Sequence, residues 1–173
     1  MTQADRPSFI YGTAWKKEAT TALVELALKS GFRAVDTANQ AKHYSEKLVG
    51  DALANMAAKG ITRDEIWLQT KFTPVDGQDH RLPYDPGADL GTQVRQSFAS
   101  SLEHLRTDYV DSYLLHGPYH YPALGPEDFE VWTAMEEIDR SGAAKSIGIS
   151  NVNLGQLEML VNWAGVKPMM VQN

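Results

Sequence analysis

Three apolar stretches of this sequence each end in a side chain that can hold or move a proton. Residues 32–36 end in Asp36, residues 66–71 end in Lys71, and residues 109–116 end in His116. Stretches with helical spacing of apolar residues separate them, so we expect three parallel strands whose carboxyl ends meet on one face. An acid, an amine and an imidazole gathered there would form a site for proton transfer.

Lys71 ends a strand that we expect to be buried on both faces, where an ammonium group is costly unless a carboxylate lies beside it. Asp36 ends the neighbouring strand and is the expected partner. The pair is either a structural ion pair or a device that lowers the pKa of a nearby phenol. His116 is likewise either a satisfied structural residue or a donor to a substrate carbonyl.

The phenol is the missing member of this site. Tyr44, shortly after the second strand, is the best candidate, and Tyr84, Tyr119 and Tyr121 lie in later loops of the same face. We interpret His43, next to Tyr44, as a loop residue rather than a catalyst.

The elements that must position these residues alternate along the chain. We expect strands at residues 9–13, 32–36, 66–71, 109–115, 145–149 and 167–172, and helices at residues 17–30, 44–59, 91–105, 126–141 and 153–164. This alternation predicts an α/β fold with a parallel sheet. An open doubly wound sheet competes with a barrel. No Gly-x-Gly-x-x-Gly loop follows the first strand and the sequence holds no Walker loop, so the strand-end residues favour a (β/α)8 TIM-type barrel.

Composition narrows the class of protein. The 173 residues, 43% of them hydrophobic and 22% charged, predict one globular domain over residues 1–173. A net charge of −6 without a basic stripe disfavours a nucleic-acid partner, and no apolar run is long enough to predict a membrane helix. The sequence has no cysteine, which excludes disulfides and Cys-based metal sites; we expect no metal and a cytoplasmic location.

Four segments in order resemble the aldo-keto reductases. They are GFRAVDTA at residues 31–38, QTK at 69–71, DYVDSYLLH at 108–116 and IGISN at 147–151, and the spacing matches from about residue 12 to residue 173. The resemblance implies an NADPH-dependent reductase with an Asp, a Tyr, a Lys and a His in its active site. Asp36, Lys71 and His116 match the first, third and fourth of these.

The tyrosine departs from the family pattern. It usually lies five residues after the aspartate, where this chain has Ala41. Residues 39–44 (NQAKHY) resemble a small insertion, because residues 49–53 resume the family pattern. The resemblance therefore implies Tyr44 as the proton donor, with Lys71 and Asp36 tuning it and His116 orienting the carbonyl.

The resemblance also implies how cofactor and substrate are held. The cofactor-binding positions are Thr13, Ser150, Asn151 and Gln172, the last three for the carboxamide of the nicotinamide. Without the resemblance, Ser150 and Asn151 would indicate only a helix N-cap. The expected substrate-contacting aromatic residues are Trp15, Phe72 and Tyr119.

The length predicts an incomplete barrel, because a complete one takes at least ~200 residues. In the family, the last two strands and their loops supply the aromatic that stacks on the nicotinamide and the basic residues that clamp the adenosine phosphates. We therefore expect NADPH binding to be weak or lost, since charge-assisted hydrogen bonds contribute ~1.5–3 kcal/mol each. Open edges on the first and sixth strands predict a homodimer or another association that covers them.

Two functional classes remain open. The first is a reductase of the aldo-keto reductase type that acts on a carbonyl of a small molecule. The alternative is a cofactor-independent isomerase, dehydratase or cyclase that uses Tyr44, Lys71 and His116 as acid and base. A third, weaker option is a non-catalytic binding subunit or a fragment.

Overall fold

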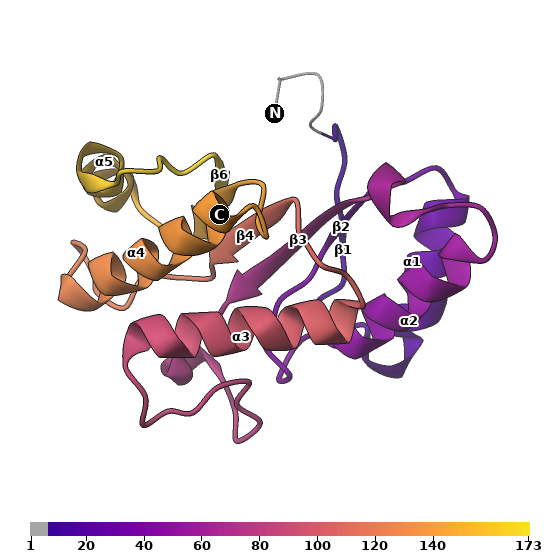
Figure 1. Cartoon of the computed structure of the whole chain (residues 1–173), viewed down its shortest axis with the longest axis horizontal. Coiled ribbons are helices and arrows are strands. Elements are labelled where there is room, and N and C mark those ends of the chain that lie inside the picture. Colours follow the sequence, from indigo (N-terminus) through magenta and orange to yellow (C-terminus); the bar gives the residue numbers. More distant parts are fainter. Residues whose placement is uncertain (1–6) are drawn as a thin grey trace.

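A computed structural model describes residues 7–173 of the protein (Figure 1). The protein is a curled parallel sheet that is covered on one face by helices. All six strands are parallel and follow one another in chain order. They are β1 (Tyr11–Gly12), β2 (Ala34–Asp36), β3 (Trp67–Phe72), β4 (Ser112–Leu115), β5 (Ile147–Ser150) and β6 (Met170–Gln172). This is the incomplete TIM-type barrel that the strand–helix alternation predicts, and the prediction is confirmed.

Five α-helices connect successive strands. They are α1 (Thr20–Lys29), α2 (Glu46–Ala57), α3 (Leu90–Leu105), α4 (Pro126–Ser141) and α5 (Leu154–Trp163), with short 3-10 helices at Lys17–Ala19, Arg63–Glu65 and Val75–Gly77. Helix α3 runs along the front of the strands in Figure 1, with α1 and α2 at one end and α4 and α5 at the other. Within residues 7–173, no helix has the length and apolar character needed to cross a membrane.

Strand alternation decides which side chains face the inside of the curl. In β3 every residue is buried, and alternate side chains point to opposite faces. Thr70 donates to Glu46 of α2 at 2.5 Å, so it faces the helices. Gln69 and Lys71 therefore face the opposite, inner side. The register pairs Asp36 with Gln69, which places the Asp36 carboxylate on that inner side too.

The sheet is strongly curled, and one contact across it shows how much. Gln172 of β6 donates to Asp36 of β2 at 3.3 Å. Four strand spacings separate these strands in the sheet order, which would be about 19 Å in a flat sheet. The hydrogen bond therefore requires the six strands to wrap around a common interior.

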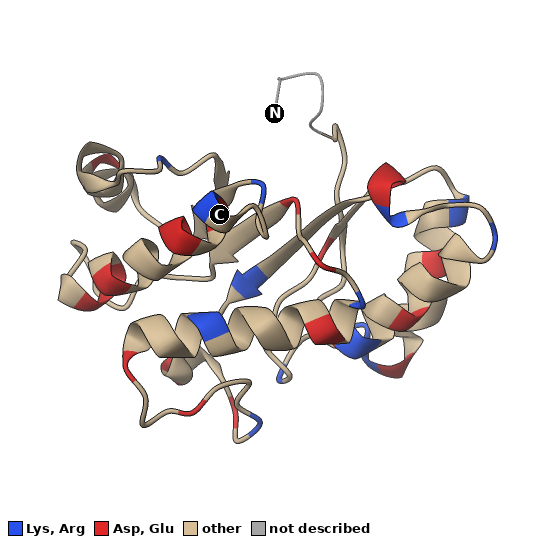
Figure 2. Ribbon diagram, in the orientation of Figure 1, with Lys and Arg blue, Asp and Glu red and all other residues tan. Residues whose placement is uncertain are grey.

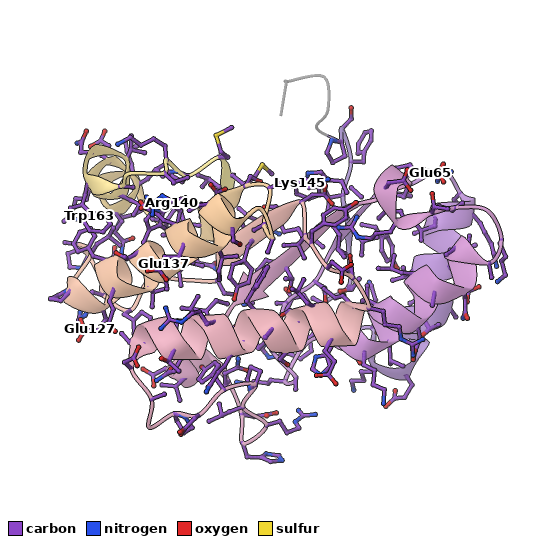
Figure 3. The ribbon with its side chains drawn as sticks, in the orientation of Figure 1. Glu65, Glu127, Glu137, Arg140, Lys145 and Trp163 are labelled. Carbon is purple, nitrogen blue, oxygen red and sulfur yellow. The ribbon has the colours of Figure 1, made fainter. Side chains whose placement is uncertain are left out.

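Contacts between side chains at the outer surface help to hold the helical layer together. Phe129 of α4 packs on Trp163 of α5 with ring centroids 4.6 Å apart, and Arg95 of α3 pairs with Glu137 of α4 at 3.1 Å. Glu137 projects from α4 and Trp163 from α5 (Figure 3). Acidic and basic residues are interspersed over these helices (Figure 2), so the layer presents no single-sign surface.

The expected boundaries hold to within a few residues, with the largest differences at strand starts. The helix predicted at residues 126–141 is found with those bounds. The strand predicted at residues 9–13 forms only over Tyr11–Gly12, and Phe9 is 78% exposed. An apolar run predicts a strand in sequence, but a strand forms only where it pairs with a neighbour. Phe9 precedes Tyr11, the first residue of β1 that pairs with β2.

The described part of the sheet has two unpaired edges. Among residues 7–173, β1 pairs only with β2, and β6 pairs only with β5. Two large apolar side chains at the β6 edge, Met169 and Val171, are exposed. Exposed edges of this kind favour association with another chain.

The contact between α2 and α3 depends on a glycine. A Cβ added at Gly50 would lie 2.0 Å from the carbonyl oxygen of His104, a backbone atom that cannot move aside cheaply. We expect Gly50→Ala to lower the free energy of unfolding by roughly 1–3 kcal/mol or more, because the two helices must separate. Urea denaturation measures this. Gly155→Ala, whose Cβ meets nothing nearer than 3.4 Å, is the matched control and should leave stability unchanged or raised. Equal effects of the two changes would contradict the close helix contact.

Candidate active site

A buried ion pair lies at the carboxyl ends of β2 and β3. The Lys71 ammonium donates to Asp36 Oδ1 at 2.5 Å and to the carbonyl oxygen of Thr37 at 2.9 Å. The side chains are only 1% and 7% exposed. Burial alone lowers the pKa of Lys71, and the nearby carboxylates of Asp36 and Glu46 oppose that shift. The predicted pairing of these residues is thus present in the structure.

Two amides complete the surroundings of the Asp36 carboxylate. Gln69 donates to Oδ1 at 2.7 Å, and Gln172 donates to Oδ2 at 3.3 Å. Gln69 also donates to the Gln172 side-chain oxygen at 2.8 Å. Asp36 therefore accepts from three side chains on two other strands, which holds it in one rotamer.

Tyr44 lies where the sequence predicts the missing phenol. The Lys71 ammonium is 5.3 Å from the centre of its ring. Its ring packs edge-on against the imidazole of His116, with centroids 5.9 Å apart. The turn at residues 41–43 precedes it, and Tyr44 N donates to the Gln40 carbonyl at 2.9 Å. The phenol, three residues beyond Ala41, is thus brought to Lys71 and His116 by this loop, whereas Ala41 is exposed.

The protonation of Tyr44 differs from the sequence-based expectation. One of the two alternatives for the Asp36–Lys71 pair was that it lowers the pKa of the phenol. Instead, burial and the negative charge of Asp36 raise the pKa of Tyr44 to about 12. The physical reason is that the Asp36–Lys71 pair is close to neutral as a unit, so burial decides the direction of the shift. Tyr44 therefore remains protonated at neutral pH and is available as an acid.

His116 is held as a neutral imidazole. Burial and the adjacent Lys71 ammonium lower the pKa of His116 to about 4. Thr73 Oγ1 lies 2.7 Å from Nδ1. When that hydroxyl donates to Nδ1, the ring proton lies on Nε2, which is then a hydrogen-bond donor. The pair of a neutral phenol and a neutral imidazole suits proton donation to an oxygen atom better than proton removal.

Trp15 and His43 form the outer part of the mouth, the opening of the curled sheet at the carboxyl ends of its strands. Their rings stack with centroids 3.9 Å apart, and Trp15 N donates to the His43 carbonyl at 2.8 Å. His43 Nδ1 lies 2.9 Å from Gln40 Oε1, which fixes the imidazole. Trp15 is 65% exposed, so its free face is accessible from solvent. His43 is thus a loop residue, as interpreted from the sequence, although an ordered one.

Three of the predicted cofactor-binding residues lie together at the ends of β5 and β6. Ser150 Oγ donates to the Gln172 carbonyl at 2.6 Å, and Asn151 N donates to the same oxygen at 3.1 Å. Asn151 has a left-handed backbone (φ 54°), and its side-chain Nδ2 donates to the His116 carbonyl at 2.8 Å. Hydroxyl and amide groups thus gather beside His116.

Two predicted contacts do not reach the mouth. Thr13 is fully buried, and its hydroxyl donates to the Asp36 carbonyl at 2.9 Å, so it supports Asp36 from below. Phe72 is fully buried against Tyr84, with centroids 5.6 Å apart. It follows the inward-facing Lys71 in β3, so strand alternation turns it toward the helices. Both side chains pack inside the protein, and the expected cofactor contact of Thr13 and substrate contact of Phe72 stay predictions.

Tyr119 stays near the candidate site. It lines a cavity of about 370 Å³ together with His116, Thr73, Gln40 and Asn151. Its backbone nitrogen donates to Asp128 at 2.6 Å, which fixes the loop after β4. A second cavity of about 420 Å³ is lined by Trp15, His43 and Tyr44. Gln40 borders both cavities.

Sequence reasoning missed three polar residues of this site. Gln69 donates to Asp36, and Thr73 contacts His116. Gln40 holds His43 and donates to the Gly77 carbonyl at 2.6 Å. The alternation of β3 carries a signal for Gln69, because a residue two positions before Lys71 shares its face. The sequence carries no comparable signal for Gln40, whose partner lies in another loop.

Comparison with known proteins gives one consistent result. A model of the Aldo/keto reductase family matches residues 8–173. The chain is 34% identical over 159 residues to methylglyoxal reductase DkgA of Escherichia coli K12, an alignment that covers 92% of this chain and 50% of the relative. It is 34% identical over 161 residues to human aldo-keto reductase family 1 member C3, covering 84% of this chain and 46% of that protein. The chain spans about half the length of the curated relatives that it matches.

Solved structures agree with the sequence matches. An aldo/keto reductase from Brucella melitensis superposes with a TM-score of 0.72 at 32% identity, covering 94% of this chain and 56% of that one. The Bombyx mori aldo-keto reductase AKR2E4, solved in complex with NADP, superposes with a TM-score of 0.74 at 28% identity, covering 94% and 52%.

The neutral state of His116 makes stability depend on pH. Its folded-state pKa of about 4 lies below the ordinary value of 6.5, so the unfolded chain binds a proton more readily. The stabilisation of the folded state that comes from the neutral imidazole is complete above pH 6.5. It is lost as pH falls toward 4, which lowers the free energy of unfolding by roughly 3 kcal/mol. We expect urea denaturation of His116→Gln to show a flatter pH dependence than wild type over this range. His80→Gln, at an exposed histidine, is the control. Parallel curves for wild type and His116→Gln would contradict the neutral imidazole.

Proposed function

The chain belongs to the aldo/keto reductase family, and we propose that it reduces a carbonyl of a small molecule with NADPH, using Tyr44 as the proton donor. The observation that carries this proposal is the convergence of Tyr44, His116 and the buried Asp36–Lys71 pair at the carboxyl ends of the strands. These residue types match the family's active site. The relatives include a methylglyoxal reductase and a protein solved with NADP.

The residues at the ends of β5 and β6 fit the carboxamide of a nicotinamide. A carboxamide needs both an acceptor and a donor. One hydrogen-bonding position remains free at each end of the Gln172 amide, which uses its other positions on Gln69 and Asp36. Asn151 uses its nitrogen within the protein, and its side-chain oxygen remains available. Ser150, Asn151 and Gln172 would therefore hold this part of NADPH.

Bound NADPH would supply a hydride to the carbonyl carbon of the substrate. The protein's own residues deliver the proton. Tyr44 gives its hydroxyl proton to the carbonyl oxygen, so that C=O becomes CH–OH, and the Lys71 ammonium stabilises the phenolate that Tyr44 becomes. A proton on His116 Nε2 donates to the same oxygen and orients it. Asp36 and Lys71 are buried beneath the site, whereas Tyr44 and His116 are half-buried and accessible to a substrate.

The size of the cavities supports a small substrate. The cavity beside His116 has a volume of about 370 Å³, and the one beside Trp15 about 420 Å³. These volumes lie at the small end of the range usual for ligand sites. Short aldehydes and dicarbonyls, with methylglyoxal as the first choice because of the relative's name, are the compounds to test.

Replacement of Tyr44 tests the assigned proton donor. We expect wild-type protein to bind NADPH, although weakly, in a fluorescence titration and to oxidise it when an aldehyde is added. Tyr44→Phe should bind NADPH equally well and lose about 100-fold or more of the turnover, because the acid is gone while its ring remains. Tyr121→Phe, at a side chain that is 84% exposed, is the matched control and should keep full activity.

Two outcomes would overturn this proposal. Full turnover in Tyr44→Phe would remove Tyr44 from its role. Absence of NADPH binding by the wild-type chain would contradict carbonyl reduction. If the wild-type chain nevertheless converted a substrate without a redox change, and Tyr44→Phe abolished that conversion, the alternative isomerase, dehydratase or cyclase activity would take its place.

We further infer that two copies of the chain associate through the open edges. The support is the pairing of β1 and β6 on one side only within residues 7–173, together with the exposed apolar side chains near β6. We expect a dimer in sedimentation velocity, and Val171→Lys, on the edge strand, should shift it to monomer. Leu26→Lys, at a side chain 58% exposed on α1, is the control. A wild-type monomer across the whole concentration series would contradict the association.

A further inference from the structure

Gln69 occupies the centre of the buried polar network. It is 1% exposed and faces the inside of the curl. Its amide nitrogen donates to Asp36 Oδ1 at 2.7 Å and to Gln172 Oε1 at 2.8 Å, so both of its N–H groups are used. Gln172 in turn donates to Asp36 Oδ2 at 3.3 Å. The three side chains form a closed ring of hydrogen bonds between β2, β3 and β6.

Packing does not explain an amide at this position. Within the described residues, the Gln69 side-chain oxygen is buried and has no hydrogen-bond partner. An unsatisfied buried acceptor is destabilising, and an apolar side chain of similar shape would avoid that loss. A methionine or leucine would therefore serve the core better. The two donated hydrogen bonds are what the amide provides and an apolar side chain does not.

We propose that Gln69 is a positioning residue that couples Gln172, on the nicotinamide side of the site, to the Asp36–Lys71 pair on the proton-transfer side. This inference rests on the proposed function, because the role of Gln172 toward NADPH is part of it. The residue reaches no substrate atom itself. It acts by fixing the rotamers of the two side chains to which it donates.

The coupling follows from how each donated bond is used. One bond to Asp36 Oδ1 stabilises the ionised carboxylate and keeps it turned toward Lys71. The other bond fixes the direction of the Gln172 amide, whose remaining free positions then point in one defined way. A change in the orientation of the Asp36 carboxylate or of the Gln172 amide therefore alters the orientation of the other group through Gln69. A network of this kind is worth more than its separate bonds, and a double-mutant cycle measures the excess.

The first test needs no cofactor. Carboxyl carbon NMR of the free protein, with the Asp36 signal assigned from Asp36→Asn, reports the hydrogen bonding of that carboxylate. The charged and titratable groups around it are Lys71 on β3, Tyr44 before α2 and His116 after β4. We expect Gln69→Met to move this signal at neutral pH, because the carboxylate loses one of its hydrogen-bond donors. Gln93→Met, at a buried glutamine of α3 that donates to the Ala88 carbonyl, is the matched control and should not move it.

The second test measures the coupling itself. We expect Gln69→Met to weaken NADPH binding about fivefold to tenfold in a fluorescence titration. In a Gln172→Met background, the same change should weaken it less than twofold, because the side chain that Gln69 orients is absent. Gln69→Asn, too short to span both partners but still polar, serves if Gln69→Met does not fold.

The outcomes separate this inference from the proposed function. If the Asp36 carboxyl signal is unmoved and Gln69→Met lowers only stability, as Gln93→Met does, Gln69 is a packing residue and the inference fails. Equal effects of Gln69→Met on NADPH binding with and without Gln172 would overturn the coupling. If the wild-type chain binds no NADPH, the proposed function fails, and the coupling that rests on it fails too. The Asp36 carboxyl signal then still decides the positioning role.

Discussion

A carboxylate and an ammonium group buried side by side are the constraint on which this structure depends. Neither Asp36 nor Lys71 could be buried alone, because removing one partner of such a pair costs about 3–5 kcal/mol. The pair therefore requires β2 and β3 to lie side by side, with the Thr37 carbonyl turned toward the ammonium. Gln172 reaches the same carboxylate only because the sheet curls, so the ion pair and the curvature support each other.

The same pair determines the chemistry of its neighbours. Because it is close to neutral as a unit, burial dominates the titration of the groups around it. The pKa of Tyr44 rises and that of His116 falls, so both side chains are uncharged at neutral pH. A protonated phenol beside a neutral imidazole is an arrangement for donating hydrogen bonds and one proton to an oxygen atom. Reduction of a carbonyl uses that arrangement directly.

Much of this architecture follows from the sequence, and the reasons for the remainder are physical. Strand–helix alternation predicts the parallel sheet, and the cost of burying Lys71 predicts its pairing with Asp36. Alternation along β3 also explains why Phe72 turns away from the mouth. A local sequence pattern does not give the spatial distance between elements that are far apart in the chain. The contact between Gln69 and Gln172 joins residues 103 positions apart and exists only because of the curl. The direction of the Tyr44 pKa shift likewise depends on how deeply the ring is buried, which no spacing of residues reveals.

The central claim is that the buried pair leaves Tyr44 protonated as an acid. Ultraviolet difference titration of wild type against Tyr44→Phe measures this directly, because only the Tyr44 phenolate absorbance separates the two proteins. The expected result is an ionisation near the value of about 12 that burial imposes. An ionisation clearly below the ordinary value of 10.0 would contradict the account, since it would show that the charge of Lys71 outweighs both Asp36 and burial.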